Sequence, residues 1–245
     1  MLAAEIDAVH QRLWLAVCHY WEPNKIHGHG PDHAMRAYSL GLQLAAAEGA
    51  DPLVVGAGCY LMDAGLRADI GRAEHIERSL RIASALCEEM PELARVRELL
   101  LTAVRYHEAE LEFPADLPKE AVCVRDSDTV DRLGFPGIRM TLQYGVWMGR
   151  PLCHPTDPLC CERTPELNGF SMDYVRYLET LPPRLLTPLA RSIAMEKQDQ
   201  RELYYGEFLS ALRQGLMRDH EDALRLVAVY MQARKGKDRD VLHIS

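Results

Sequence analysis

The sequence predicts an all-α protein, and three observations support this fold class. Apolar residues recur at helical spacing through most of the 245 residues. No segment shows the period-two alternation and β-branched enrichment that are typical of strands. Prolines and glycines separate the periodic segments, as they do where helices begin and end. We therefore expect one domain, residues 1–245, built as a compact helical bundle with additional C-terminal helices.

Composition limits the classes of function. Apolar residues make up 48% of the chain and charged residues 26%, which is typical of a soluble globular protein. The formal net charge of -8 gives no support to general binding of nucleic acid or of an anionic membrane. The longest uncharged apolar stretch, residues 52–62, is too short to span a bilayer. The N-terminal segment is typical of a helix and not of a signal peptide, so we expect a cytoplasmic protein.

The cysteines agree with that location. Their number, seven, is odd, which does not favour a complete set of disulfides. Four of them lie within apolar helical patterns, as buried reduced thiols of cytosolic proteins do: Cys18, Cys59, Cys87 and Cys123.

The first predicted helix covers residues 2–21. One face carries Ile6, Val9, Leu13 and Val17, while His10 and His19 lie off that face. A loop rich in glycine and histidine follows over residues 23–31.

The next two helices form a predicted hairpin. In the first of them, Ala37, Leu40 and Leu44 share a face with His33, and Gly49 ends the helix. Asp51 and Pro52 then supply a cap residue and a first-turn proline for the second helix, in which Gly56, Cys59 and Asp63 share a side. The hairpin would point the His33 imidazole and the Asp63 carboxylate toward a common space, and these groups are a donor pair for a metal ion.

Three further helices carry polar residues on or beside an apolar stripe. Residues 71–90 have His75 near their N-terminal end, the helix that begins at Pro91 has His107 at the end of its stripe, and the helix after Pro118 has Asp128 on its apolar face. A break at residues 134–137 and a helix over residues 138–148 follow.

Residues 149–169 differ in kind, because they contain four prolines, two glycines and three cysteines. This composition predicts a structured loop or an insertion. Cys153, Cys160 and Cys161, with His154, are enough ligands for a zinc or iron–sulfur centre, but their spacing lacks the C-x2-C pattern and favours ordinary thiols. A lid over the active site is another interpretation. Helices are expected again within residues 170–234, over residues 172–181, 184–214 and 219–233.

Several segments resemble the HD-domain superfamily of metal-dependent phosphohydrolases. In that family a lone His is followed by a His-Asp pair and, much later, by an Asp. DHAMRAYSLGLQLA resembles the first-His helix and GAGCYLMDAG the segment with the pair. AEHIERSLRIASAL and LLTAVRYHE resemble helices that carry two extra histidines in a large subgroup, and VRDSDTVDRLGFPGIR resembles the distal-Asp segment. The resemblance covers residues 25–145 closely, as an HD-like core.

The resemblance implies a metal centre and an activity. The implied ligands are His33, Asp63, His75, His107 and Asp128, with Asp126 as the second choice for the last position. In two-metal members the pair aspartate, here Asp63, bridges the metals. Mixed histidine and carboxylate donors suit one or two ions of Mn, Fe, Co, Ni or Zn. The implied reaction is hydrolysis of a small phosphorylated molecule such as a nucleotide, since a divalent cation polarises a phosphoryl oxygen and supplies hydroxide at neutral pH.

Met62 departs from the family pattern, because it stands where the pair histidine is expected. A thioether is a soft and weak ligand for these ions. The His33, Asp63 and Asp128 site would then bind metal weakly, or the Asp63, His75 and His107 site would act alone. In a third alternative the chain keeps the fold and binds a ligand or a partner without catalysis. The same donor set also holds two irons in HD-type oxygenases, which is a second enzyme class.

The candidate catalytic residues are Asp63, His29 and Arg36. His29 lies four residues before His33 and can contact phosphate or transfer a proton; the alternative is an exposed loop histidine. Arg36 lies one turn after His33 and can neutralise a phosphate; the alternative is a surface salt bridge. The sequence leaves these alternatives open, together with the oligomeric state.

Overall fold

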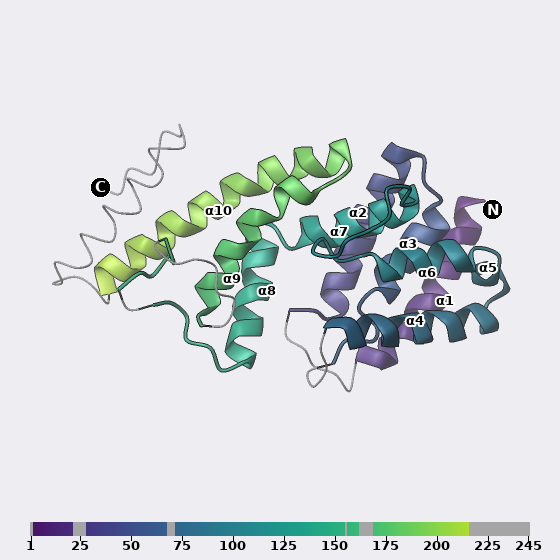
Figure 1. Cartoon of the computed structure of the whole chain (residues 1–245), viewed down its shortest axis with the longest axis horizontal. Coiled ribbons are helices and arrows are strands. Elements are labelled where there is room, and N and C mark those ends of the chain that lie inside the picture. The colour runs from purple at the N-terminus through teal and green to yellow at the C-terminus, as the bar shows by residue number, and fades with distance from the viewer. Residues whose placement is uncertain (1, 22–27, 68–71, 155, 162–168, 216–245) are drawn as a thin grey trace. The chain divides into compact units, whose positions relative to one another are not determined.

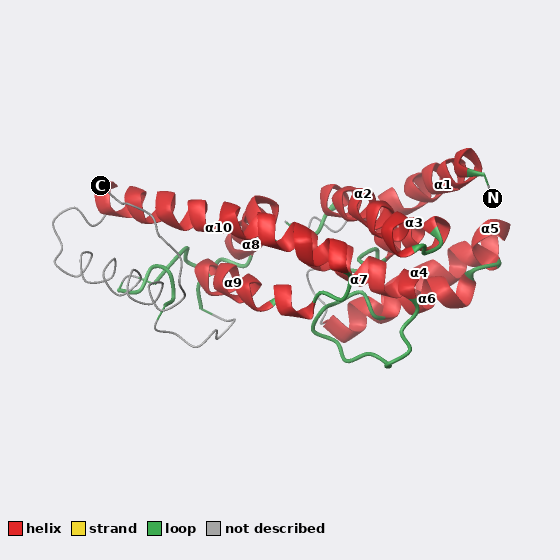
Figure 2. Cartoon of the chain, turned by 90° about the horizontal axis from the view of Figure 1, so that it is seen from above, coloured by secondary structure: helices red, strands yellow, loops and turns green. Residues whose placement is uncertain are grey.

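The structure is a computed structural model that describes residues 2–21, 28–67, 72–154, 156–161 and 169–215. Within these ranges the regular elements are all helices and none is a strand, as Figures 1 and 2 show. The all-α prediction is therefore confirmed. The helix predicted over residues 219–233 lies outside the described residues. No helix within the described ranges is long and apolar enough to cross a membrane.

The chain divides into two compact units. The first comprises Met1–Arg132 and Leu181–Ile193, and the second comprises Leu133–Thr180 and Ala194–Ser245. The sequence predicted a single domain whose core ends near residue 145, so the division at residues 132–133 falls inside that predicted core. Helical structure is interrupted there at Leu133, which is extended with a φ of -103° and a ψ of 160°, and Gly134 begins the next helix with a left-handed φ of 65° that glycine tolerates without strain.

Seven complete α-helices lie among the described residues of the first unit: α1 (Ala3–Trp21), α2 (Pro31–Glu48), α3 (Pro52–Leu61), α4 (Arg72–Glu89), α5 (Pro91–Ala94), α6 (Arg97–Arg105) and α7 (Lys119–Asp131). Helix α3 packs against α1, α2, α6 and α7, and every residue from Leu53 to Leu61 is buried. Two glycines allow this close packing. A Cβ atom on Gly41 of α2 would lie 2.7 Å from Cys59 Sγ, and one on Gly58 would lie 2.7 Å from Val124 Cγ2 of α7.

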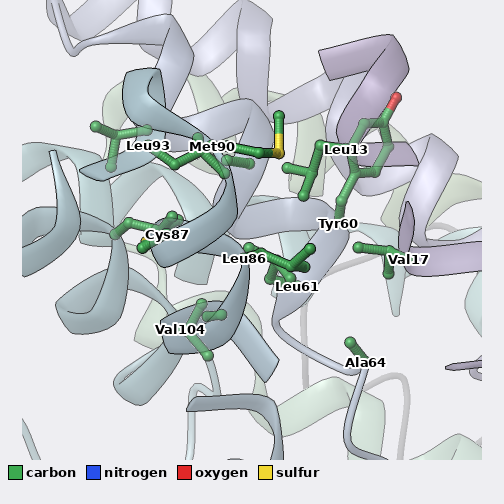
Figure 3. Close-up of a cluster of buried hydrophobic side chains, with 14 of the residues drawn as sticks. Leu13, Val17, Tyr60, Leu61, Ala64, Leu86, Cys87, Met90, Leu93 and Val104 are labelled. Atoms are coloured by element: carbon green, nitrogen blue, oxygen red, sulfur yellow. The ribbon is translucent and has the colours of Figure 1, made fainter. Parts of the chain in front are cut away.

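The apolar core of the first unit joins the stripes that the sequence predicted. Leu13 and Val17 of α1, Leu61 of α3 and Val104 of α6 are fully buried in one cluster (Figure 3). The predicted stripe of α4 is buried in the same cluster: Ile76, Leu80, Ala83, Cys87 and Met90. Each large apolar side chain buried in this way contributes about 1.5–3 kcal/mol to folding. The core therefore fixes the ends of α3, α4 and α6, where the candidate metal ligands lie.

Two local predictions differ from the structure, and one buried histidine was not predicted. The helix predicted from Pro91 to His107 is two helices, α5 and α6, because Val96 leaves the helical conformation, with φ -116° and ψ 15°. Residues 134–137 do not precede the next helix but form its first turn, in α8 (Gly134–Trp147). His10 lies off the α1 stripe yet is buried. Its Nε2 donates to the Leu53 carbonyl at 3.2 Å, while Nδ1 lies 3.0 Å from the Tyr38 hydroxyl.

The second unit has its own small core. It contains α8, α9 (Ser171–Tyr177), the 3-10 turn Leu178–Thr180 and most of α10 (Pro188–Gly215); the 3-10 turn Pro182–Arg184 belongs to the first unit. Ile138, Met172, Val175 and Tyr205 pack together there. The helices predicted over residues 172–181 and 184–214 correspond to α9 with its following turn and to α10.

The cysteine-rich loop contributes to that second core. Cys160 is buried, and Cys153 and Cys161 pack against the same cluster. All seven cysteines lie in described residues and none forms a disulfide. No group of three potential metal donors found among the described residues includes one of these cysteines. The loop thus agrees with ordinary thiols, and its interpretation as a lid stays a prediction.

Candidate metal centre

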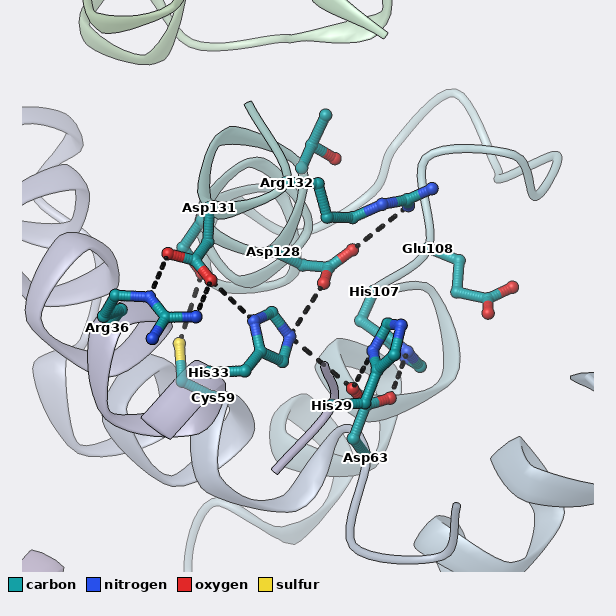
Figure 4. Close-up of polar contacts among 12 residues, drawn as sticks. His29, His33, Arg36, Cys59, Asp63, His107, Glu108, Asp128, Asp131 and Arg132 are labelled. Carbon is teal, nitrogen blue, oxygen red and sulfur yellow. Dashed lines mark hydrogen bonds and ion pairs between the residues drawn. The ribbon is translucent and has the colours of Figure 1, made fainter. Parts of the chain in front are cut away.

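Asp63 lies at the centre of a cluster of buried polar side chains in the first unit (Figure 4). It lies in the turn formed by residues 62–65, directly after the last residue of α3. Because α3 is buried along its length, a turn at its end keeps the carboxylate inside the unit. The Asp63 side chain is only 9% exposed.

The two carboxylate oxygens of Asp63 face different histidines. Oδ2 lies 3.3 Å from His29 Nδ1 and 3.5 Å from His33 Nε2. Oδ1 lies 3.5 Å from His107 Nε2 and 3.6 Å from His75 Nε2. In each of the two resulting groups the donor atoms all lie within 4.8 Å of one another. One carboxylate is thus shared by two sets of nitrogen donors.

These distances suit divalent transition metals. Two ligands on one ion lie about 3.0–3.5 Å apart when each metal–ligand bond is about 2.0–2.2 Å long. His33 Nε2 is buried and makes no hydrogen bond of acceptable geometry, although it lies 3.2 Å from Asp128 Oδ1 as well as close to Asp63. Buried nitrogens normally have a hydrogen-bond partner. A nitrogen that instead faces two carboxylates is placed as a metal ligand would be.

His33 is held in this orientation from behind. Its Nδ1 donates to Asp131 Oδ2 at 2.8 Å, so Nε2 points at Asp63 and Asp128. Arg36 in turn donates to both oxygens of Asp131, from Nε at 2.9 Å and from Nη2 at 3.0 Å. A carboxylate behind a metal-binding histidine fixes its tautomer and makes it a better ligand. Sequence reasoning missed Asp131, although its place three residues after Asp128 puts both on one face of α7.

The two extra histidines come from the ends of α4 and α6. His107 follows α6, and its Nδ1 donates to the Val104 carbonyl at 2.8 Å, which turns Nε2 toward Asp63. His75 lies in the first turn of α4, near Asp63 because that helix closely approaches the turn at residue 65. A Cβ atom on Gly65 would lie 2.4 Å from the Ser79 backbone nitrogen. Glu108 Oε1, another acidic group that sequence reasoning missed, lies 4.0 Å from His75 Nε2.

The structure distinguishes Asp128 from Asp126. Asp128 faces His33 and also lies 3.6 Å from Arg132 Nη1. Asp126 is fully buried elsewhere and accepts hydrogen bonds from the backbone N–H groups of Leu186 and Thr187 and from the Thr187 hydroxyl. Of the two aspartates that the sequence offered for the distal position, only Asp128 lies beside His33.

In the metal-free chain, the histidines and aspartates of the centre strongly shift one another's pKa values. Burial alone would lower the pKa of His33, but Asp128 and Asp131, with Asp63, raise it to about 10. Burial likewise disfavours a charged His107, yet Asp63 raises its pKa to about 9. Burial would raise the pKa of Asp63, but hydrogen bonds from His107 and His29 hold it well below its usual range. Imidazolium protons thus balance the carboxylates, and a bound cation would displace them.

The predicted catalytic residues occupy two different positions. His29 faces the Asp63 carboxylate, with a side chain that is 33% exposed. Arg36 pairs with the exposed Asp32 and with the buried Asp131, so only part of its ion pairing lies at the surface. These contacts leave a phosphate-binding role for Arg36 as a prediction only. The Nε2 atoms of His75 and His107 lie 3.6 Å and 3.5 Å from Asp63 Oδ1. Both distances are shorter than two metal–ligand bonds of about 2 Å each, as a second metal site requires.

Comparison with known proteins identifies the fold. No family model matches the sequence, and no curated protein matches it. Solved structures do match. A protein of Lactobacillus plantarum has a TM-score of 0.62 and 19% identity, over 85% of this chain and 96% of that one. An HD-superfamily hydrolase of Bacillus thuringiensis has a TM-score of 0.61 and 21% identity, over 85% of this chain and 98% of that one.

A third similar structure is that of Bacillus subtilis YpgQ in complex with ADP. Its TM-score is 0.57 at 15% identity, over 81% of this chain and 92% of that one. The chain therefore has the HD-domain fold, and the resemblance seen in the sequence is confirmed at the level of the fold. At these identities the similarity defines no substrate.

Proposed function

We propose that this chain is a divalent-metal-dependent phosphohydrolase that acts on a small phosphorylated molecule, with a nucleotide as the substrate class. The sharing of Asp63 between two sets of histidines carries this proposal. Its two oxygens face separate nitrogen donors at 3.3–3.6 Å, as a bridging carboxylate would. A buried aspartate that only formed a structural ion pair with one cation would not need its two oxygens to face different histidines.

Two groups of residues would hold the metal. His33, Asp63 and Asp128 form one, and Asp63, His75 and His107 form the other. A divalent cation supplies Lewis acidity toward a phosphoryl oxygen and a hydroxide nucleophile at neutral pH. The mixture of imidazole and carboxylate donors favours Mn, Fe, Co, Ni or Zn over Mg.

The remaining residues of the centre orient these donors and place charge near them. Asp131 fixes His33, and the Val104 carbonyl fixes His107. Arg132 donates to both oxygens of Glu110 and lies 3.6 Å from Asp128. The Arg132 guanidinium would therefore place positive charge beside the Asp128 side of the centre, where a phosphoryl group would bind.

The nucleotide substrate class is supported by similarity of fold. YpgQ, whose solved structure contains ADP, and the hydrolase of Bacillus thuringiensis share this fold. In hydrolysis of a nucleoside phosphate, water would attack a phosphorus atom while the P–O bond to the leaving group breaks. Attack at the terminal phosphorus would release inorganic phosphate, and attack at the α-phosphorus of a triphosphate would release pyrophosphate and a nucleoside monophosphate.

The test is hydrolysis of a panel of nucleoside mono-, di- and triphosphates by protein stripped with a chelator. We expect release of phosphate or pyrophosphate only after Mn²⁺, Co²⁺, Ni²⁺, Fe²⁺ or Zn²⁺ is added. The Asp63→Asn variant should be inactive, while Asp32→Ala, which removes an exposed carboxylate outside the cluster, should keep the activity.

Three results would contradict the proposal. Ligand binding without turnover under all metals would indicate a non-catalytic HD domain. Tightly bound iron with O2 consumption and no phosphate release would indicate the oxygenase class. Equal hydrolysis by wild type and Asp63→Asn would show that the activity does not belong to this centre.

A further inference from the structure

Met62 leaves one side of the centre with fewer nitrogen donors. Its side chain is fully buried, and its only heteroatom is a thioether sulfur, a weak ligand for the metals that suit this site. On the Asp63 Oδ2 side, the sequence therefore predicted a single nitrogen, that of His33. The structure brings a second nitrogen to that oxygen.

That second nitrogen belongs to His29. Its Nδ1 lies 3.3 Å from Asp63 Oδ2, the same oxygen that His33 Nε2 approaches to 3.5 Å. His29, His33 and Asp63 form a group with donor atoms within 4.8 Å of one another. The two rings are T-shaped, with centroids 5.5 Å apart, so both nitrogens converge on one oxygen without stacking of the rings. Figure 4 shows the His29 ring beside the Asp63 carboxylate.

The backbone before α2 places His29 there. Gly28 has a φ of 99°, a backbone conformation that residues other than glycine adopt only with strain. Pro31 then begins α2, and His33 follows in its first turn. The chain thus bends at residue 28 so that residues 29 and 33, four apart, face the same carboxylate.

We propose that His29 is a metal ligand on the His33 side of Asp63 and supplies the nitrogen that Met62 lacks. The site would comprise His29, His33, Asp63 and Asp128, with two nitrogen and two carboxylate donors. This inference rests on the metal centre of the proposed function. This role for His29 differs from the three that the sequence left open, which were phosphate contact, proton transfer and an exposed loop position.

The test measures metal binding without reference to turnover. Chelator-stripped protein is titrated with Co²⁺, and binding is followed by calorimetry and by the visible absorption of the bound ion. The variants are His29→Ala, Met62→His and the double variant His29→Ala/Met62→His. His19→Ala, which removes an exposed histidine of α1, is the matched control.

We expect His29→Ala to weaken one Co²⁺ site by at least about 100-fold, since loss of even an outer partner of a ligand costs about 10–100-fold. The double variant should recover most of that affinity, because an imidazole at residue 62 restores the missing nitrogen. Added imidazole should partly restore Co²⁺ binding to His29→Ala, since the side chain is partly exposed and leaves access. The control should bind as wild type does. Circular dichroism in chelator checks that each variant is folded.

Several outcomes would overturn the inference. If wild type binds Co²⁺ and hydrolyses nucleotide while His29→Ala binds as tightly, His29 is not a ligand and the proposed function stands. If His29→Ala loses affinity but neither Met62→His nor imidazole restores it, His29 does not stand in for residue 62. If wild type binds no Co²⁺, both the inference and the proposed function fail.

Discussion

The carboxylate of Asp131 holds His33 from behind, with Oδ2 at 2.8 Å from Nδ1, while Nε2 of the same ring faces Asp63 and Asp128. Asp131 is itself fixed by Arg36. The contact orients His33, and Asp131 is not one of the proposed metal ligands, so its effect can be separated from that of the proposed ligands.

Asp131→Ala should lower the affinity for Mn²⁺ by about 10–100-fold, as loss of such an outer carboxylate does elsewhere. The matched control is Asp32→Ala, because Asp32 also pairs with Arg36 but does not touch His33. Mn²⁺ titration followed by electron paramagnetic resonance measures both. Equal affinities for the two variants would show that Asp131 does not position His33.

Substitutions of Asp126 and Asp128 in α7 should have different effects, one on stability and the other on metal binding. Asp126→Asn should reduce the free energy of unfolding by about 2–4 kcal/mol, because it disturbs a buried carboxylate that accepts three N–H and O–H donors, and should leave metal stoichiometry unchanged. Asp128→Asn should weaken metal binding with little loss of stability. Urea unfolding and elemental analysis measure the two properties. The reverse pattern would assign the ligand role to Asp126.

The metal-free protein should be most stable between about pH 4 and about pH 6.5. Asp128 and Asp131 outweigh burial and raise the pKa of His33 to about 10, and Asp63 raises that of His107 to about 9, against about 6.5 in an unfolded chain. Their stabilisation is complete below pH of about 6.5 and is lost as pH rises through about 9 and 10. Asp63 and Asp131 have lowered pKa values, so their contribution is lost as pH falls below about 4.

Urea unfolding of chelator-stripped protein from pH 3 to pH 10.5 measures this dependence. In Asp131→Ala the alkaline loss should be smaller and complete at a lower pH, since His33 loses one carboxylate partner and its pKa in the folded chain falls. A free energy of unfolding that stays constant from about pH 7 to about pH 10.5 would contradict the electrostatics of the centre.

Gly65→Ala should damage the centre through packing alone. An added Cβ would lie 2.4 Å from the Ser79 backbone nitrogen and 2.6 Å from the His75 carbonyl oxygen. The turn that carries Asp63 would have to move away from α4. We expect a loss of several kcal/mol in stability, as overpacking against backbone causes, together with weaker metal binding on the His75 side. Full stability and full metal content in this variant would show that α4 and the turn are less tightly packed than described.

Much of the fold followed from apolar periodicity. The stripes of α1 and α4 are buried as predicted because a helix must bury its apolar face. The break at Val96 could not be predicted, because no glycine or proline marks it and a continuous stripe of apolar residues crosses it. The burial of His10 was missed for a related reason: its partners, Tyr38 and the Leu53 carbonyl, are distant in sequence.

The candidate site was predictable where its members end apolar stripes, as Asp63 and His107 do. Asp131 and Glu108 were missed because their roles depend on partners from other helices, His33 and His75. The choice between Asp128 and Asp126 likewise required the contact of Asp126 with Thr187, 61 residues away. Spacing along one helix identifies a shared face, but it cannot show which carboxylate another segment already occupies.

The most direct test of the metal centre is thermal unfolding of wild type and Asp63→Asn, each with and without Mn²⁺. A ligand at 100 times its Kd stabilises the native state by about 2.7 kcal/mol, which for a chain of this size corresponds to a rise in Tm of roughly 5–10 °C. We expect this rise in wild type alone, because Asp63 belongs to both donor groups. Identical unfolding curves in all four samples would contradict a metal centre at Asp63.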